Sequence, residues 1–76
     1  MSSLPAPFTS EAWITHVFSS KAAHDGAIIR RKLRDVERYV GRDRFEAELR
    51  RRGYQAVENA GQILIFCNRE PVRLIL

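Results

Sequence analysis

The chain has few of the residues on which catalytic and metal sites usually depend. Its 76 residues include one cysteine, Cys67, and two histidines, His16 and His24. A single cysteine cannot form a disulfide within the chain, and three scattered thiol and imidazole groups are too few for a zinc site. We therefore predict no metal and no cofactor. Because Cys67 ends an apolar run at residues 63–67, we expect it to be a core residue.

Long apolar runs are also missing. No stretch approaches the roughly 20 apolar residues that a membrane span needs, and residues 1–8 lack the basic and apolar regions of a secretory signal. We therefore expect a cytoplasmic protein without a membrane partner. Residues 1–8 combine serines and prolines in a way typical of a disordered tail. This leaves residues 9–76 for a single small domain, and the 45% apolar content is enough for one core.

A catalytic site would need a nucleophile beside a general base. The candidates are Cys67 with His16 or His24, oriented by Asp25. The spacing of these residues does not bring them together, and the glycines do not form a phosphate-binding loop. The sequence therefore favours a non-catalytic binding role and leaves enzymatic activity without a candidate site.

The N-terminal part of the domain fits two kinds of element. Ser10 can cap a helix that ends near Phe18, because apolar residues from Trp13 to Phe18 fall at helical i, i+4 spacing. The same residues are also strand formers. Helix and strand both remain open for this segment.

An amphipathic helix is predicted from Ala27 onward, because apolar residues recur there every three or four positions within a sector of about 60°. These residues are Ile29, Leu33, Val36 and Val40. Gly41 is expected to end this helix. A second helix is predicted after it. Asp43 is expected to cap this helix, Gly53 is expected to end it, and one of its sides is expected to be buried. The buried residues expected on the second helix are Phe45 and Leu49.

The pattern after Gly53 predicts three strands. Residues 54–59 form the first, and the continuously apolar residues 63–67 form a central strand that is covered on both faces. The alternating residues from Val72 to Leu76 form the last. The predicted fold class is therefore α+β, with two consecutive helices packed on a three-stranded antiparallel sheet.

The positive charge of the chain is concentrated in its centre. Residues 27–52 hold ten basic and five acidic side chains, a net of +5, whereas the remaining residues hold three basic and four acidic ones. Clustered basic side chains can bind phosphates through counterion release, so we predict DNA or RNA as a partner. On the predicted first helix, four arginines fall within a sector of about 100°, and three more end the second helix. The predicted contact residues are Arg30, Arg31, Arg34, Arg38, Arg50, Arg51 and Arg52.

A solvated surface of ion pairs is the competing interpretation of the same charges. Carboxylates stand three or four residues from several of the arginines, which is the spacing of ion pairs on a helix. The expected pairs are Arg31–Asp35, Arg34–Glu37, Glu46–Arg50 and Glu48–Arg52.

Two known architectures share part of this order of elements. A helix, a short turn, an Arg-rich helix and a hairpin resemble a winged helix-turn-helix DNA-binding domain, which implies that residues 43–52 are the recognition helix and residues 54–66 the wing. Residues 49–76 resemble HicA-type toxin ribonucleases, whose catalytic histidine lies around the first hairpin. This chain has Gln62 there and no histidine after His24.

Self-association is the alternative function. If the strand from Val72 to Leu76 lies at a sheet edge, its free backbone groups can pair with a second copy and form a homodimer. The leading hypothesis is a small basic module that binds nucleic acid through its arginines.

Overall fold

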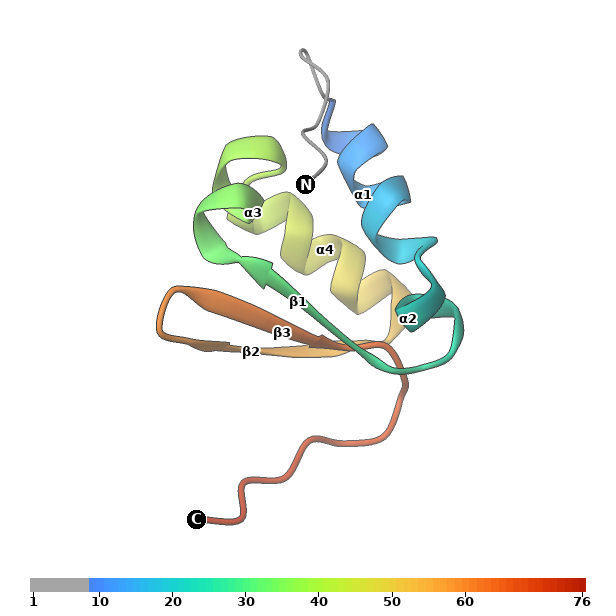
Figure 1. Ribbon diagram of the computed structural model, residues 1–76, viewed down its shortest axis with the longest axis vertical. Helices are drawn as coiled ribbons and strands as arrows, with labels where there is room; N and C mark the ends of the chain where they lie inside the picture. Colours follow the sequence, from blue (N-terminus) through green and yellow to red (C-terminus); the bar gives the residue numbers. More distant parts are fainter. Residues whose placement is uncertain (1–8) are drawn as a thin grey trace.

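The computed structural model describes residues 9–76, and the tail predicted at residues 1–8 lies outside the described residues. This part of the chain forms a small α+β domain, which confirms the predicted fold class (Figure 1). Its elements are α1 (Ser10–Phe18), α2 (Lys21–His24), β1 (Ile28–Lys32), α3 (Leu33–Tyr39), α4 (Arg42–Arg52), β2 (Gln55–Asn59) and β3 (Gln62–Phe66).

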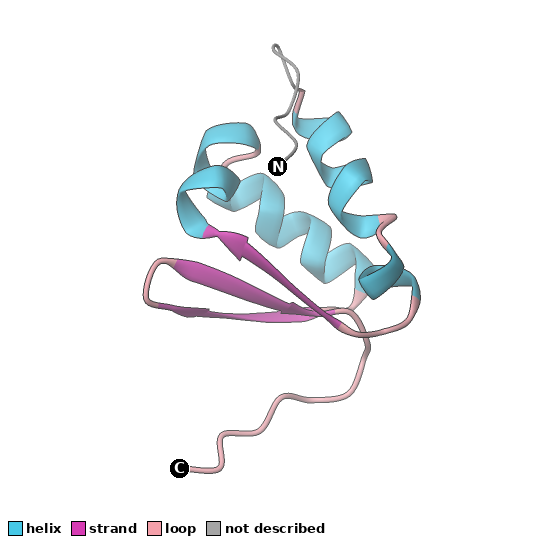
Figure 2. Ribbon diagram, viewed as in Figure 1, coloured by secondary structure: helices cyan, strands magenta, loops and turns pink. Residues whose placement is uncertain are grey.

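The sheet is antiparallel and has the strand order β1-β3-β2. Ile65 in β3 faces Ile29 of β1 on one side and Ala56 of β2 on the other. Strand β3 is therefore central, as its apolar sequence predicted, but the predicted cover on both faces is wrong, because within residues 9–76 the helices pack on one face only. Figure 2 shows the helices on one side of the three strands.

The core lies between the helices and that side of the sheet. It is formed by the buried apolar side chains of α1, α3 and α4 together with alternate residues of the strands. Residues with at most 3% exposure are Trp13, Val17, Ile29, Val36, Phe45 and Ile65. Cys67 is also buried in this core, as predicted.

The segment from Trp13 to Phe18, which the sequence left open, is helical. The hydroxyl of Thr9 accepts a hydrogen bond from the backbone N–H of Ala12 at 3.0 Å and caps α1. The predicted cap, Ser10, instead donates from Oγ to the carbonyl of Tyr39 at 2.9 Å. This bond ties α1 to the end of α3.

The helix predicted from Ala27 was placed too early, because residues 28–32 form strand β1 and α3 begins at Leu33. Two adjacent β-branched residues, Ile28 and Ile29, favour a strand, and β3 needs a partner on this side. The spacing from Ile29 to Leu33 matched a helical period by chance across the junction of strand and helix.

The second predicted helix is α4, and its start differs in detail. Gly41 is its N-cap, with φ +89° and ψ 149°, and Asp43 lies inside the first turn without a capping bond. Phe45 and Leu49 are buried, as predicted. Gly53 ends the helix in the left-handed conformation at φ +76°, as its position predicted.

The strand predicted from Val72 to Leu76 does not form. Both sides of β3 are occupied by β1 and β2, so the third strand of the sheet comes from residues 28–32 instead. After β3 the chain is held by the side chain of Asn68, which donates to the carbonyl of Gly26 at 3.1 Å. Residues 72–76 then extend away from the domain (Figure 1).

Candidate nucleic-acid interface

The seven predicted contact arginines lie in two separate places. Arg30 and Arg31 are in β1, whereas Arg34 and Arg38 are in α3. The single helical stripe predicted for these four residues is therefore wrong, because successive side chains of a strand point to opposite faces. The second group, Arg50, Arg51 and Arg52, ends α4 as predicted.

The arginines at the end of α4 are engaged by carboxylates. Glu48 is buried, with 8% exposure, and accepts hydrogen bonds from Nη2 of Arg51 at 2.6 Å and from Nε of Arg52 at 2.5 Å. Arg50 lies 3.5 Å from Glu46. These contacts confirm the predicted pairs Glu46–Arg50 and Glu48–Arg52.

The Glu48 pair has a clear electrostatic signature. The hydrogen bond from Arg51 lowers the pKa of Glu48 against the opposing effect of burial, and the bond from Arg52 adds to the lowering. The same carboxylate raises the pKa of Arg51. The charges at the end of α4 therefore stabilise one another within the fold.

Other basic residues of α4 are paired as well. Nη2 of Arg42 lies 3.0 Å from Glu58 of β2, and Nη2 of Arg44 lies 3.5 Å from Glu11 of α1. The bond to Glu58 raises the pKa of Arg42. The arginines of α4 therefore connect this helix to its neighbours, in agreement with the interpretation as ion pairs.

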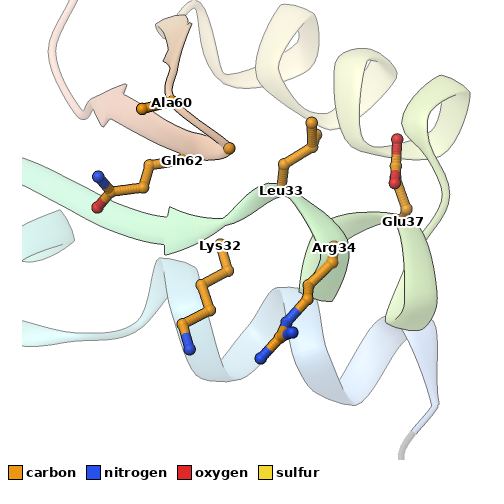
Figure 3. Close-up of a pocket in the computed structure, with 7 residues that line it drawn as sticks. Lys32, Leu33, Arg34, Glu37, Ala60 and Gln62 are labelled. Carbon is orange, nitrogen blue, oxygen red and sulfur yellow. The ribbon is translucent and has the colours of Figure 1, made fainter.

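The basic residues around the junction of β1 and α3 have a different environment. Within residues 9–76, no carboxylate forms an ion pair with Arg30, Lys32 or Arg34. The predicted pairs Arg31–Asp35 and Arg34–Glu37 do not form. Arg31 belongs to the strand rather than to the helix of Asp35. Arg34 and Glu37 extend in opposite directions (Figure 3).

The two remaining arginines of this region have contacts that involve no carboxylate. Arg31 is half-buried, and its Nη1 donates to the carbonyl of Arg30 at 2.8 Å. Cζ of Arg38 lies 5.6 Å from the centre of the Tyr39 ring, which is within the range of a cation–π contact.

An open groove of about 540 Å³ lies beside this junction. It is lined by Lys32, Leu33, Arg34, Glu37, Ala60, Gly61 and Gln62. The backbone N–H of Leu33 donates to the carbonyl of Gly61 at 2.8 Å, so the start of α3 is fixed to the β2–β3 turn. Lys32 and Arg34 extend side by side in the same direction (Figure 3). The groove therefore has a positively charged rim on a fixed backbone.

Lys32 was missed by the sequence prediction. In β1, Arg30 and Lys32 are two residues apart and share one face of the sheet, opposite the buried Ile29. Arg30 pairs with Leu64 and Lys32 with Gln62 in the strand register. If residues 28–32 had been treated as a strand, in which alternate side chains share a face, the predicted contact residues would have included Lys32 and left out Arg31.

The residues considered for catalysis do not form a reactive centre. Cys67 is 4% exposed, and burial raises the pKa of its thiol, which makes it a poor nucleophile. His16 and His24 are exposed. Among residues 9–76, no three histidine, cysteine or carboxylate side chains lie close enough to hold a metal ion. None of the helices in this part of the chain is long and apolar enough to cross a membrane.

No protein-family model, curated protein or solved structure matches this chain. Functional interpretation therefore rests on the geometry of the basic residues and of the exposed apolar surfaces.

Proposed function

We propose that the protein binds nucleic acid through phosphate contacts made by Arg30, Lys32 and Arg34, called here the basic rim. The observation that carries this proposal is the division of the arginines by ion pairing. Those of α4 are matched with carboxylates, whereas no carboxylate in residues 9–76 is paired with the basic rim.

Unpaired cations are suited to phosphate for an energetic reason. A paired arginine must first lose its carboxylate, whereas an unpaired and exposed one exchanges only water and counterions for phosphate. The backbone of the basic rim is also fixed, since β1 pairs with β3 and Leu33 is bonded to Gly61. Because the backbone is already ordered, binding costs only the conformational entropy of the side chains.

Fluorescence anisotropy tests this proposal with labelled single-stranded RNA and labelled duplex DNA. The protein is titrated at two salt concentrations, and we expect binding that weakens steeply as salt is raised. The triple variant Arg30→Glu, Lys32→Glu and Arg34→Glu is expected to lose binding while its circular dichroism spectrum stays unchanged.

A charge-matched control separates a local site from an effect of overall charge. Lys21→Glu, Arg50→Glu and Arg69→Glu change the net charge by the same amount at exposed positions elsewhere. This control should retain most of the affinity of the parent protein. Equal losses in the two triple variants, or no binding by the parent at low salt, would contradict the proposal.

Self-association is a second candidate function, and one observation favours it. Leu74, Ile75 and Leu76 are 91%, 97% and 109% exposed, although large apolar side chains are rarely left in water together. Residues 72–76 are therefore proposed to contact a second copy of the chain, as the sequence suggested, although not as a strand of the monomer sheet.

A further inference from the structure

The sheet has an apolar surface on the face that points away from the helices, called here the open face. No helix or strand within residues 9–76 packs on it (Figure 1). The strand register places Ile28 beside Phe66 and Val57 beside Leu64 on this face. Ile28 is 54% exposed and Val57 is 39% exposed. The open face therefore presents four neighbouring apolar side chains to water, and the same register places Arg30 beside Leu64 among them.

Residues 72–76, called here the C-terminal segment, form the other exposed apolar surface. The segment starts beside the sheet, where the backbone N–H of Val72 donates to Oε1 of Gln55 at 2.6 Å. Gln55 pairs with Phe66, so the segment starts at the apolar end of the open face. It leaves on the side of the sheet opposite the helices (Figure 1). Open face and segment therefore lie on the same side of the molecule.

We infer that the C-terminal segment of one copy packs on the open face of a second copy, and that the second copy does the same in return. This inference rests on the second candidate function, self-association, and does not depend on nucleic-acid binding. The interface would have two-fold symmetry, so both apolar surfaces of both copies are buried at once.

A second copy suits the open face better than the chain's own segment does. Residues 74–76 are almost fully exposed, so they contact little of their own domain. The direction of the segment is set before it begins, because the N–H of Glu70 donates to the side chain of Asn68 at 3.0 Å and Pro71 follows. From this point the segment extends away from its own sheet (Figure 1), so its apolar side chains are left for a second copy to cover.

The length of the segment also fits. Five extended residues span roughly 17 Å at about 3.3 Å per residue, and three strands separated by about 4.8 Å span roughly 10 Å. One segment can therefore cross all three strands of a partner sheet. Alternation in the segment places Val72, Leu74 and Leu76 on one side, which matches a flat apolar face.

The two proposed surfaces adjoin each other on the sheet. Ile28 and Phe66 lie at one end of the open face, whereas Lys32 and Gln62 lie at the other. Arg34 follows in α3, beyond the sheet. Arg30 lies between these two ends, beside Leu64, and therefore borders the dimer interface. A dimer centred on the apolar end would leave Lys32 and Arg34 accessible to nucleic acid.

Analytical ultracentrifugation over a range of concentrations provides the test. The parent protein is expected to sediment as a dimer at micromolar concentration. Leu74→Asp changes the segment and Ile28→Asp changes the open face, and each should weaken the dimer at least tenfold. Ala47→Asp, at an exposed position of α4, adds the same charge away from both surfaces and should leave the dimer unchanged. Circular dichroism checks that each variant is folded.

Mixing the two variants distinguishes the reciprocal arrangement from other dimers. A heterodimer of Leu74→Asp and Ile28→Asp keeps one intact pair, formed by the segment of one chain and the open face of the other, so the mixture should associate more strongly than either variant alone. A parent dimer that Ile28→Asp leaves intact, or a mixture that gains nothing, would overturn this inference while self-association stands. A parent protein that stays monomeric at high concentration would overturn both.

Discussion

Glu48 and Arg52 form a direct ion pair, with Nε of Arg52 2.5 Å from Oε2 of Glu48. Cζ of the same guanidinium lies 4.6 Å from the centre of the Phe18 ring in α1. Arg52 therefore joins the last turn of α4 to the end of α1, and its charge is balanced by a carboxylate that is itself buried. This part of the positive charge stabilises the fold.

Replacing this carboxylate should destabilise the domain more than replacing an exposed one. We expect Glu48→Gln to lower the free energy of unfolding by about 1–2 kcal/mol, because it removes charge-assisted hydrogen bonds to Arg51 and Arg52. Glu46→Gln is the matched control, because its pairs with arginine are 3.5 and 3.6 Å long and exposed, and it should cost less than about 0.5 kcal/mol. Urea unfolding measures both values. Equal losses would contradict a structural role specific to Glu48.

The same pair predicts a dependence of stability on pH. Because Arg51 and Arg52 lower the pKa of Glu48, the folded state holds the carboxylate charged more strongly than the unfolded state does. The stabilisation is therefore complete above the ordinary pKa of 4.5 and is lost as the pH falls through the lowered value. The difference in unfolding free energy between the parent and Glu48→Gln should shrink on acidification. A difference that stays constant between pH 7 and pH 3 would contradict this prediction.

The sequence predicted the class of the fold but not every member of the sheet. The apolar run at residues 63–67 predicted the central strand correctly, although the cover on both faces expected for such a run is absent within residues 9–76. The second strand that pairs with it was predicted wrongly. Both Val72 to Leu76 and residues 28–32 have the sequence of a strand, and the structure pairs residues 28–32 with it. Only the tertiary register, in which Ile29 meets Ile65, distinguishes the two.

The candidate site was predicted only in part, because residues 28–32 were assigned to a helix rather than to a strand. Arg30 and Arg34 were identified, but the helical period that selected them also selected Arg31 and passed over Lys32. The spacing of residues in the sequence also could not show which arginines have no carboxylate as an ion-pair partner. Glu37 is three residues from Arg34, yet the two side chains diverge (Figure 3). Both residues line a groove beside the β2–β3 turn, a neighbour that is distant in sequence.

The β2–β3 turn offers a stabilising substitution. Ala60 has φ +53° and Gly61 has φ +73°, which is the pattern of a two-residue type I′ turn. Alanine is disfavoured in this conformation, whereas asparagine tolerates it. Ala60→Asn should therefore raise the free energy of unfolding by about 0.5–1 kcal/mol in urea unfolding. Ala47→Asn, in the middle of α4, is the control and should lower stability. A destabilised Ala60→Asn variant would show that the turn does not carry this strain.

The salt dependence of nucleic-acid affinity counts the contacts of the basic rim. If Arg30, Lys32 and Arg34 each meet one phosphate of single-stranded RNA, the logarithm of the binding constant should fall with the logarithm of salt concentration with a slope of about −2. Arg34→Ala removes one contact and should reduce the magnitude of this slope by about 0.7. Arg50→Ala, which removes an arginine paired with Glu46, should leave the slope unchanged. Anisotropy titrations between 50 and 200 mM salt, roughly the range over which such slopes are resolved, measure all three proteins. A slope that falls equally in both variants would mean that affinity follows total charge, and the division between paired and unpaired arginines would then have no functional meaning.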